Sequence, residues 1–130
     1  MTTIQGNEEN LKQAIEGEGI VLVDFWAPWC GPCRVFGPVF EKVSDEFADA
    51  SFVKVNTQDE QKIAAMFQIE AIPTLMVFRD SVMLFRQAGV VPEAGLREII
   101  TQAQQLDMDQ VRKEIAESEA ADKAGGSEEE

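Results

Sequence analysis

The chain of 130 residues contains no histidine and no tyrosine, and cysteine occurs at only two positions. Without histidine, the chain alone cannot form a Ser-His-Asp or Cys-His catalytic unit or a histidine-ligated metal site. Two cysteines are also too few for a zinc site made of four cysteines from one chain. These shortages exclude several common kinds of catalytic and metal-binding site.

Basic residues are scarce as well. The chain has 11 lysines and arginines and 24 acidic residues, which gives a net charge of −13. Nucleic acids and anionic lipids are bound mainly through basic side chains, so we expect neither as a partner. No apolar run approaches the ~20 residues of a membrane-spanning helix, and the charged first twenty residues do not resemble a secretory signal. We therefore expect a cytoplasmic monomer, in a compartment where paired cysteines are more often catalytic than structural.

The hydrophobic pattern predicts one α/β domain over residues 1–106, with a central mixed β-sheet flanked by helices on both faces. The run Ile20–Trp26 is almost continuously apolar, as in a strand covered on both faces. Further strands are predicted around Ile4 and at 51–56, 74–78 and 82–85, the last two forming a hairpin around Asp80 and Ser81. Helices are predicted at 7–16, after Cys33, and at 92–105. Another helix, bearing Ile63, Met66 and Phe67, is predicted from the capping-box spacing of Thr57 and Glu60.

Residues 107–130 form a separate acidic C-terminal extension with nine acidic and three basic residues. Asp107 and Gln110 are typical of a helix start, and the apolar residues Met108, Val111 and Ile115 follow at helical spacing. We expect a short helix here, followed by a disordered tail over 125–130. The extension is either a solvated tail or a docking helix for a basic partner.

Cys30 and Cys33 lie two residues apart, after a predicted strand and at the start of a predicted helix. Unpaired N–H groups at a helix start stabilise an anion, so the pKa of the Cys30 thiol should fall and its reactivity should rise. Cys33 lies one turn further in and should be the more buried resolving thiol. Gly31 permits close approach of a partner backbone, and Pro32 suits the first helical turn. The alternative is an incidental pair or half of a metal site shared with another chain.

Asp24 is an acidic residue inside the apolar strand, six positions before Cys30. Burial should raise the pKa of its carboxyl, which then suits it to accept the proton of Cys33 during attack on a mixed disulfide. Lys54, on the neighbouring predicted strand, is its expected electrostatic partner. The alternative is a structural aspartate bonded to the backbone.

Two further features flank the cysteines. A cis peptide bond before Pro73 would expose the backbone of Ile72 as an edge for pairing with an extended peptide. Trp29 is predicted to face the substrate and Trp26 to lie in the core, although packing alone would also explain a tryptophan at either position.

The segment VDFWAPWCGPCR, residues 23–34, resembles the active-site segment of the thioredoxin family. The resemblance covers about residues 4–106 and includes Pro38, the strand FVKVN, the triplet Ile72-Pro73-Thr74 and Gly89. It implies a thioredoxin fold in which Cys30 is the nucleophile, Cys33 the resolving thiol and Asp24 the buried acid. It also implies that Lys54 lies near that acid and that Pro73 is the cis-proline facing the disulfide. The positions that match the family's partner-binding surface are Trp29, Gly31, Pro32, Ile72, Gly89 and Val90.

The resemblance implies a disulfide reductase that needs no bound cofactor. Its redox-active centre would be the Cys30–Cys33 disulfide, and its electrons would come from NADPH through thioredoxin reductase. Its partners would be that reductase and proteins that contain disulfides. A different class of function stays open, namely a redox-switched binding module or chaperone-like adaptor that uses the fold and the acidic extension.

Overall fold

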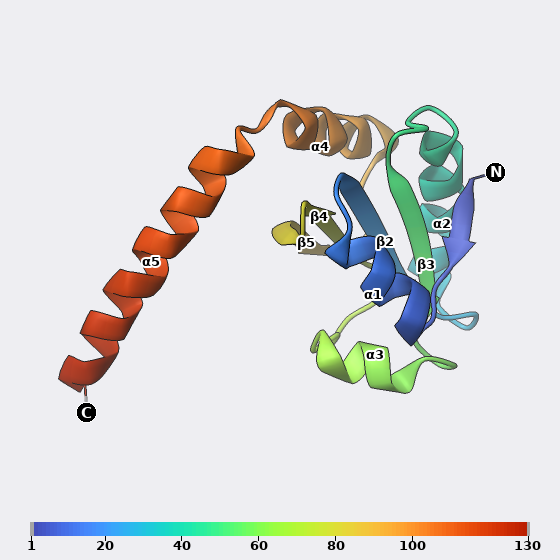
Figure 1. Cartoon of the computed structure of the whole chain (residues 1–130). Helices are drawn as coiled ribbons and strands as arrows, with labels where there is room; N and C mark the ends of the chain where they lie inside the picture. Colours follow the sequence, from blue (N-terminus) through green and yellow to red (C-terminus); the bar gives the residue numbers. More distant parts are fainter. Residues whose placement is uncertain (1, 130) are drawn as a thin grey trace.

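The computed structural model describes the backbone of residues 2–129 and the side chains of residues 2–121. Figure 1 shows the arrangement of its elements. The strands are β1 (Thr3–Gln5), β2 (Ile20–Trp26), β3 (Ser51–Asn56), β4 (Thr74–Arg79) and β5 (Val82–Ala88). The helices are α1 (Glu8–Glu16), α2 (Gly31–Ser44), α3 (Gln61–Met66), α4 (Glu93–Gln105) and α5 (Met108–Glu129). No helix in the described part of the chain is long and apolar enough to cross a membrane.

Across the described residues the strands form one mixed sheet in the order β1-β3-β2-β4-β5. The strands β1, β3 and β2 run parallel, whereas β4 is antiparallel to both β2 and β5. The central position of β2 explains its apolar sequence, because helices cover both of its faces. The predicted α/β class and mixed sheet are therefore confirmed.

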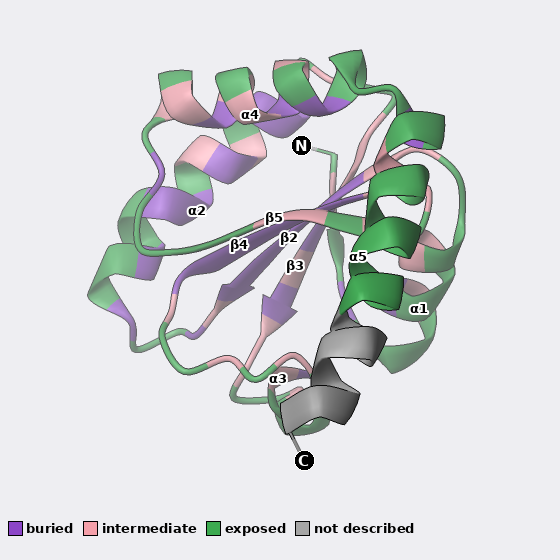
Figure 2. Ribbon diagram, turned by 90° about the vertical axis from the view of Figure 1, so that its left-hand side faces the viewer, coloured by how far each residue is buried: buried purple, intermediate pink, exposed green. Residues whose placement is uncertain are grey.

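Helices cover the two faces of the sheet in pairs, as Figure 2 shows. On one face, α2 and α4 pack against a core that includes Leu22, Phe52 and Leu96. On the other face, α1 and α3 contribute Leu11 and Ile63 to a second core. Because side chains alternate along a strand, Asp24 of β2 and Lys54 of β3 lie on the same face as Leu22 and Phe52, beneath α2.

Several element boundaries differ from the sequence prediction. The helix α3 begins at Gln61, so Thr57 is not its capping residue, and the Thr57 hydroxyl instead donates to the Trp26 carbonyl at 3.1 Å. A contact with strand β2 therefore takes the place of the helix cap that the local sequence pattern predicted. The strand β5 continues to Ala88 because its pairing with β4 extends as far as Thr74. The hairpin around Asp80 and Ser81 is confirmed, and both residues have the positive φ typical of a two-residue turn.

The helix α5 follows α4 and leads away from the sheet in Figure 1. Its first turn is attached to the domain, since Met108 is only 6% exposed and the Arg112 guanidinium lies 3.8 Å from the Asp80 carboxylate. The helix is longer than the short helix we predicted, because good helix formers such as Ala116 and Glu117 continue it. The side chains beyond residue 121 lie outside the described residues, and the disorder predicted for 125–130 stays a prediction.

Candidate functional site

The two cysteines lie at the start of α2 and form a disulfide. Cys30 is the N-cap residue, with extended backbone, and Pro32 occupies the first turn, where a missing N–H costs nothing. The Cys33 backbone N–H donates to the Cys30 sulfur at 3.2 Å, and the two Cα atoms are 5.2 Å apart. A helix start thus directs an N–H group at the sulfur of Cys30, an arrangement that favours the thiolate once the disulfide is reduced.

The two cysteines do not differ in burial as we predicted, because both are 4% exposed. In the disulfide form the pair packs as one unit with Ala27, Trp26 and Ile72. Packing around the closed disulfide therefore buries Cys30 as deeply as Cys33, although their positions in the helix alone predicted that Cys33 would be more buried. Trp26 itself is half-buried beside this cluster, rather than fully inside the core.

The peptide bond between Ile72 and Pro73 is cis, as predicted. The Ile72 carbonyl oxygen lies 3.6 Å from the Cys30 sulfur, so this loop faces the disulfide. Gly89 connects the next loop to it, because the Gly89 N–H donates to the Pro73 carbonyl at 2.8 Å. Gly89 has a φ of +97°, which a residue with a Cβ rarely adopts.

Exposed apolar side chains surround this cluster. Trp29, between β2 and α2, is 68% exposed, and Val90, after β5, is 40% exposed. Gly31 and Pro32 are exposed as well. Val35 is 60% exposed on the first turns of α2, and the sequence analysis missed it. Its position outside the apolar stripe of Phe36 and Phe40 was the signal that it points away from the core.

Asp24 is completely buried, and within the described part of the chain neither of its carboxylate oxygens has a hydrogen-bond partner. Burial raises the pKa of this carboxyl from 3.8 to about 7, while Lys54 lowers it and Glu41 raises it. Burial is the largest of these effects, since a low dielectric disfavours the charged form. The group therefore changes its protonation near neutral pH, as a proton acceptor in this pH range requires.

Lys54 pairs in register with Asp24 on the adjacent strand, but its ammonium nitrogen contacts other groups. It lies 3.4 Å from the Glu41 carboxylate and 5.1 Å from the centre of the Trp26 ring. The sequence analysis missed Glu41. A signal was available, because Cys33, Gly37 and Glu41 follow one another at intervals of four residues and so share one face of α2.

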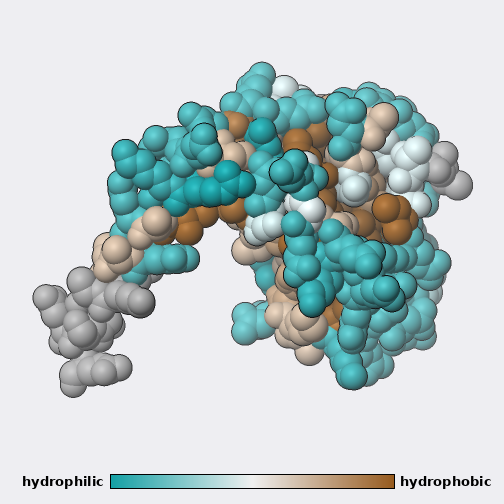
Figure 3. Space-filling view, viewed as in Figure 1, coloured by the Kyte–Doolittle hydropathy of each residue, from teal (hydrophilic) through white to brown (hydrophobic). Residues whose placement is uncertain are grey.

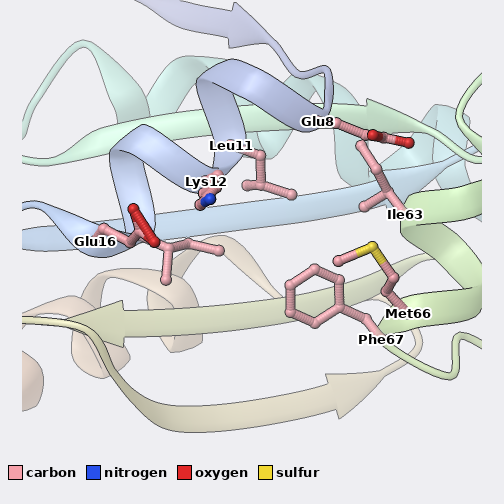
Figure 4. Close-up of a pocket in the computed structure, with 8 residues that line it drawn as sticks. Glu8, Leu11, Lys12, Glu16, Ile63, Met66 and Phe67 are labelled. Atoms are coloured by element: carbon pink, nitrogen blue, oxygen red, sulfur yellow. The ribbon is translucent and has the colours of Figure 1, made fainter.

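A cavity of about 260 Å³ lies beside this ion pair, with Cys33, Glu41 and Lys54 among its lining residues. A second hollow of about 290 Å³ lies between α1 and α3 and is lined mainly by apolar side chains (Figure 4). Neither cysteine lines this second hollow. Figure 3 shows a mainly hydrophilic surface over the body of the molecule, with smaller hydrophobic patches between the hydrophilic side chains.

The site combines a disulfide at a helix start with a buried acid in the strand that precedes this helix, on a mixed sheet covered by helices. This combination defines a protein that exchanges disulfides with its substrates.

Comparisons with known proteins identify the family. The family model described as Thioredoxin matches residues 2–102. A putative thioredoxin 2 from Streptomyces coelicolor is 47% identical over 119 residues, which cover 92% of this chain and 89% of the relative. Thioredoxins of known structure from Malassezia sympodialis and, as a mutant, from Halobacterium salinarum are 35% and 30% identical, with TM-scores of 0.70 and 0.72. They cover 78% and 81% of this chain, which covers 91% of each.

The chain belongs to the thioredoxin family. It is a thiol–disulfide oxidoreductase of the thioredoxin type, which reduces protein disulfides through its Cys30–Cys33 pair. The alignment with the Streptomyces relative is longer than the 106 residues of the predicted domain and therefore includes part of the acidic extension.

Proposed function

We propose that Cys30 is the attacking residue and Cys33 the resolving residue of this reductase. The Cys30 thiolate attacks a target disulfide, forms a mixed disulfide and releases one target thiolate. The Cys33 thiolate then attacks the Cys30 sulfur and releases the second target thiolate. The target gains two electrons and two protons in total, and the Cys30–Cys33 disulfide remains. The N–H group directed at the Cys30 sulfur is the observation that supports this assignment.

Asp24 accepts the proton of the Cys33 thiol before that thiol attacks, and Lys54 adjusts the charge around it. The complete burial of Asp24 supports this role, as does a pKa of about 7. A group with such a pKa takes up and releases protons at the pH at which a thiol must be activated.

The binding surface for targets consists of Trp29, Gly31, Pro32, Ile72, Gly89 and Val90. The exposure of Trp29 and Val90 and the proximity of the Ile72 carbonyl to the Cys30 sulfur support this assignment. An extended target segment would pair with the backbone at Ile72 and place its disulfide against Cys30, beside Pro73.

The reductase works in the cytoplasm as a monomer, and thioredoxin reductase restores its dithiol with electrons from NADPH. No bound cofactor takes part. Residues 1–106 form the thioredoxin domain and 107–130 an accessory extension. Membership of the family supports this cycle, and turnover of NADPH by a thioredoxin reductase in the presence of the oxidised protein tests it.

The reduction of insulin by dithiothreitol, followed as turbidity, tests the assigned roles. Wild-type protein should accelerate the reaction, and Cys30→Ser should abolish the acceleration. Cys33→Ser should accumulate a mixed disulfide at Cys30 that mass spectrometry detects. Asp24→Asn should slow the reaction about tenfold or more near neutral pH, by analogy with other general bases. The exposed control Asp59→Asn should behave as wild type.

Two results would contradict these assignments. Full activity of Cys30→Ser in cells would favour the adaptor function over the reductase. A pH profile of disulfide reduction that is the same for Asp24→Asn and wild type would remove Asp24 as the proton acceptor.

A further inference from the structure

The buried acid and the nearest lysine do not form the ion pair that their positions on the sheet suggest. Asp24 and Lys54 are register partners on adjacent parallel strands, and both lie on the face covered by α2. The Lys54 ammonium nevertheless contacts the Glu41 carboxylate at 3.4 Å, and both Asp24 oxygens lack a hydrogen-bond partner among the described residues.

The packing of α2 explains where the lysine goes. A Cβ atom at Gly37 would lie 3.7 Å from the Lys54 nitrogen, so the lysine runs beside this glycine towards Glu41, one turn further along. The Trp26 ring, 5.1 Å from the nitrogen, contacts the ammonium as well. Two independent contacts thus hold the charge at the wall of the cavity that also includes Cys33.

We propose that Glu41 is a positioning residue, which holds the Lys54 ammonium at the cavity wall and so withholds it from the Asp24 carboxyl. The Glu41 side chain is 29% exposed and Asp24 is fully buried, so Glu41 carries a negative charge at lower cost and attracts the lysine more strongly. The inference rests on the proposed role of Asp24 in proton transfer, which Glu41 adjusts through Lys54.

The charges around Asp24 agree with this inference. Glu41 raises the pKa of Asp24 and Lys54 lowers it, in addition to the larger effect of burial. Arg34, also on the cavity wall, donates to the Pro28 carbonyl at 3.0 Å. Cys33 is the remaining titratable group that faces the cavity, once the disulfide is reduced.

The titration of Asp24 in a Glu41→Gln variant tests the proposal directly. Loss of the Glu41 charge frees the ammonium to approach Asp24, and both changes stabilise the Asp24 carboxylate. We expect the midpoint of the Asp24 carboxyl titration, followed by ¹³C NMR, to fall by about one pH unit. The pH profile of disulfide reduction should move to lower pH with it. Glu93→Gln is the matched control, because it removes the same charge from ion pairs with Lys42 and Arg97, and it should leave both readouts unchanged.

A double-mutant cycle with Lys54→Gln separates the indirect effect from the direct one. In the Lys54→Gln background, Glu41→Gln should lower the Asp24 midpoint by clearly less than in the wild type. An unchanged or higher midpoint in Glu41→Gln, or an equal effect in both backgrounds, overturns the proposal. A lower midpoint without any change in the rate profile would support the positioning role of Glu41 and reject Asp24 as the proton acceptor.

Discussion

At the scale of single residues, Asp24 combines complete burial with a carboxylate that has no hydrogen-bond partner among the described residues, and the two are rarely found together. Asp24 lies in the middle of β2, between Val23 and Phe25, both fully buried. An ionised carboxylate in such a position is costly, so the folded protein binds a proton there more tightly than the unfolded chain does. A site that destabilises the fold in this way is consistent with a catalytic role.

The pH dependence of stability should report this cost. The folded-state pKa of Asp24 is raised to about 7 from 3.8. The stability gained from proton binding at Asp24 is therefore complete below pH 3.8 and is lost as the pH rises from there through 7. We expect the free energy of unfolding of Asp24→Asn, relative to wild type, to increase by a few kcal/mol between pH 4 and pH 8, at about 1.4 kcal/mol per unit of pKa difference.

Urea unfolding of both oxidised proteins at several pH values measures this difference. Only its change with pH is informative, because the buried asparagine has its own unpaired polar atoms. Parallel stability curves for the two proteins would show that Asp24 has an ordinary pKa in the folded state.

At the scale of elements, the end of one strand binds the end of a helix. The Arg79 guanidinium, at the last residue of β4, donates to the carbonyls of Ala103 and Leu106 at 2.8 Å each. The last carbonyls of a helix have no partner within it, so these charged donors satisfy acceptors at the C-terminus of α4. The neighbouring residue Asp80 accepts from the Gly19 N–H and lies near Arg112 of α5. One corner of the sheet thus joins α4 and α5 to the hairpin turn.

Replacement of this arginine should weaken the attachment of α4. We expect Arg79→Gln to lower the free energy of unfolding by about 1–2 kcal/mol, because hydrogen bonds from a charged donor are lost at a partly buried site. Urea unfolding gives the value, with the exposed Lys62→Gln as a control for the loss of one positive charge. Equal stability of the two variants would mean that water replaces the arginine at no cost.

At the scale of the whole molecule, the helix α5 adds an acidic rod to a domain that already has all the groups of the redox site. Met108 is its buried contact with the domain, and Ile115, two turns later, is 38% exposed. The extension carries nearly half of the net charge of the chain. Its first turn therefore has a structural contact, whereas the described side chains from 112 to 121 are exposed.

Deletion of residues 107–130 should separate these two contributions. We expect the melting temperature to fall, with a loss of about 2 kcal/mol for the buried Met108 side chain, and insulin reduction to stay unchanged. Deletion of 122–130 alone retains Met108 and Arg112 and should leave both quantities unchanged. If the longer deletion weakens turnover by a thioredoxin reductase or binding of a basic partner, the extension is a docking helix and not a solvated tail.

The local pattern of the sequence determined the chemistry of this protein and most of its elements. The spacing of Cys30 and Cys33, the apolar run with Asp24 inside it, and the Ile72-Pro73 pair are local features, and the structure placed each of them near its predicted element. The length of α5 followed from its own helix-forming residues and was still underestimated, whereas two other predictions failed because of neighbours distant in the chain. Thr57 did not cap α3 because Trp26 accepts its hydroxyl, and Cys30 is as buried as Cys33 because Ile72 and Ala27 pack on the disulfide.

Only the tertiary structure decided which charges meet beneath α2. The sequence paired Lys54 with Asp24, since it could place the two residues on neighbouring strands, but it could not show how α2 crosses β3. That crossing puts Glu41 within 3.4 Å of the lysine. The pKa of Asp24 depends on burial and on electrostatic interactions that weaken over a few ångströms. Both are set when segments far apart in the chain pack together.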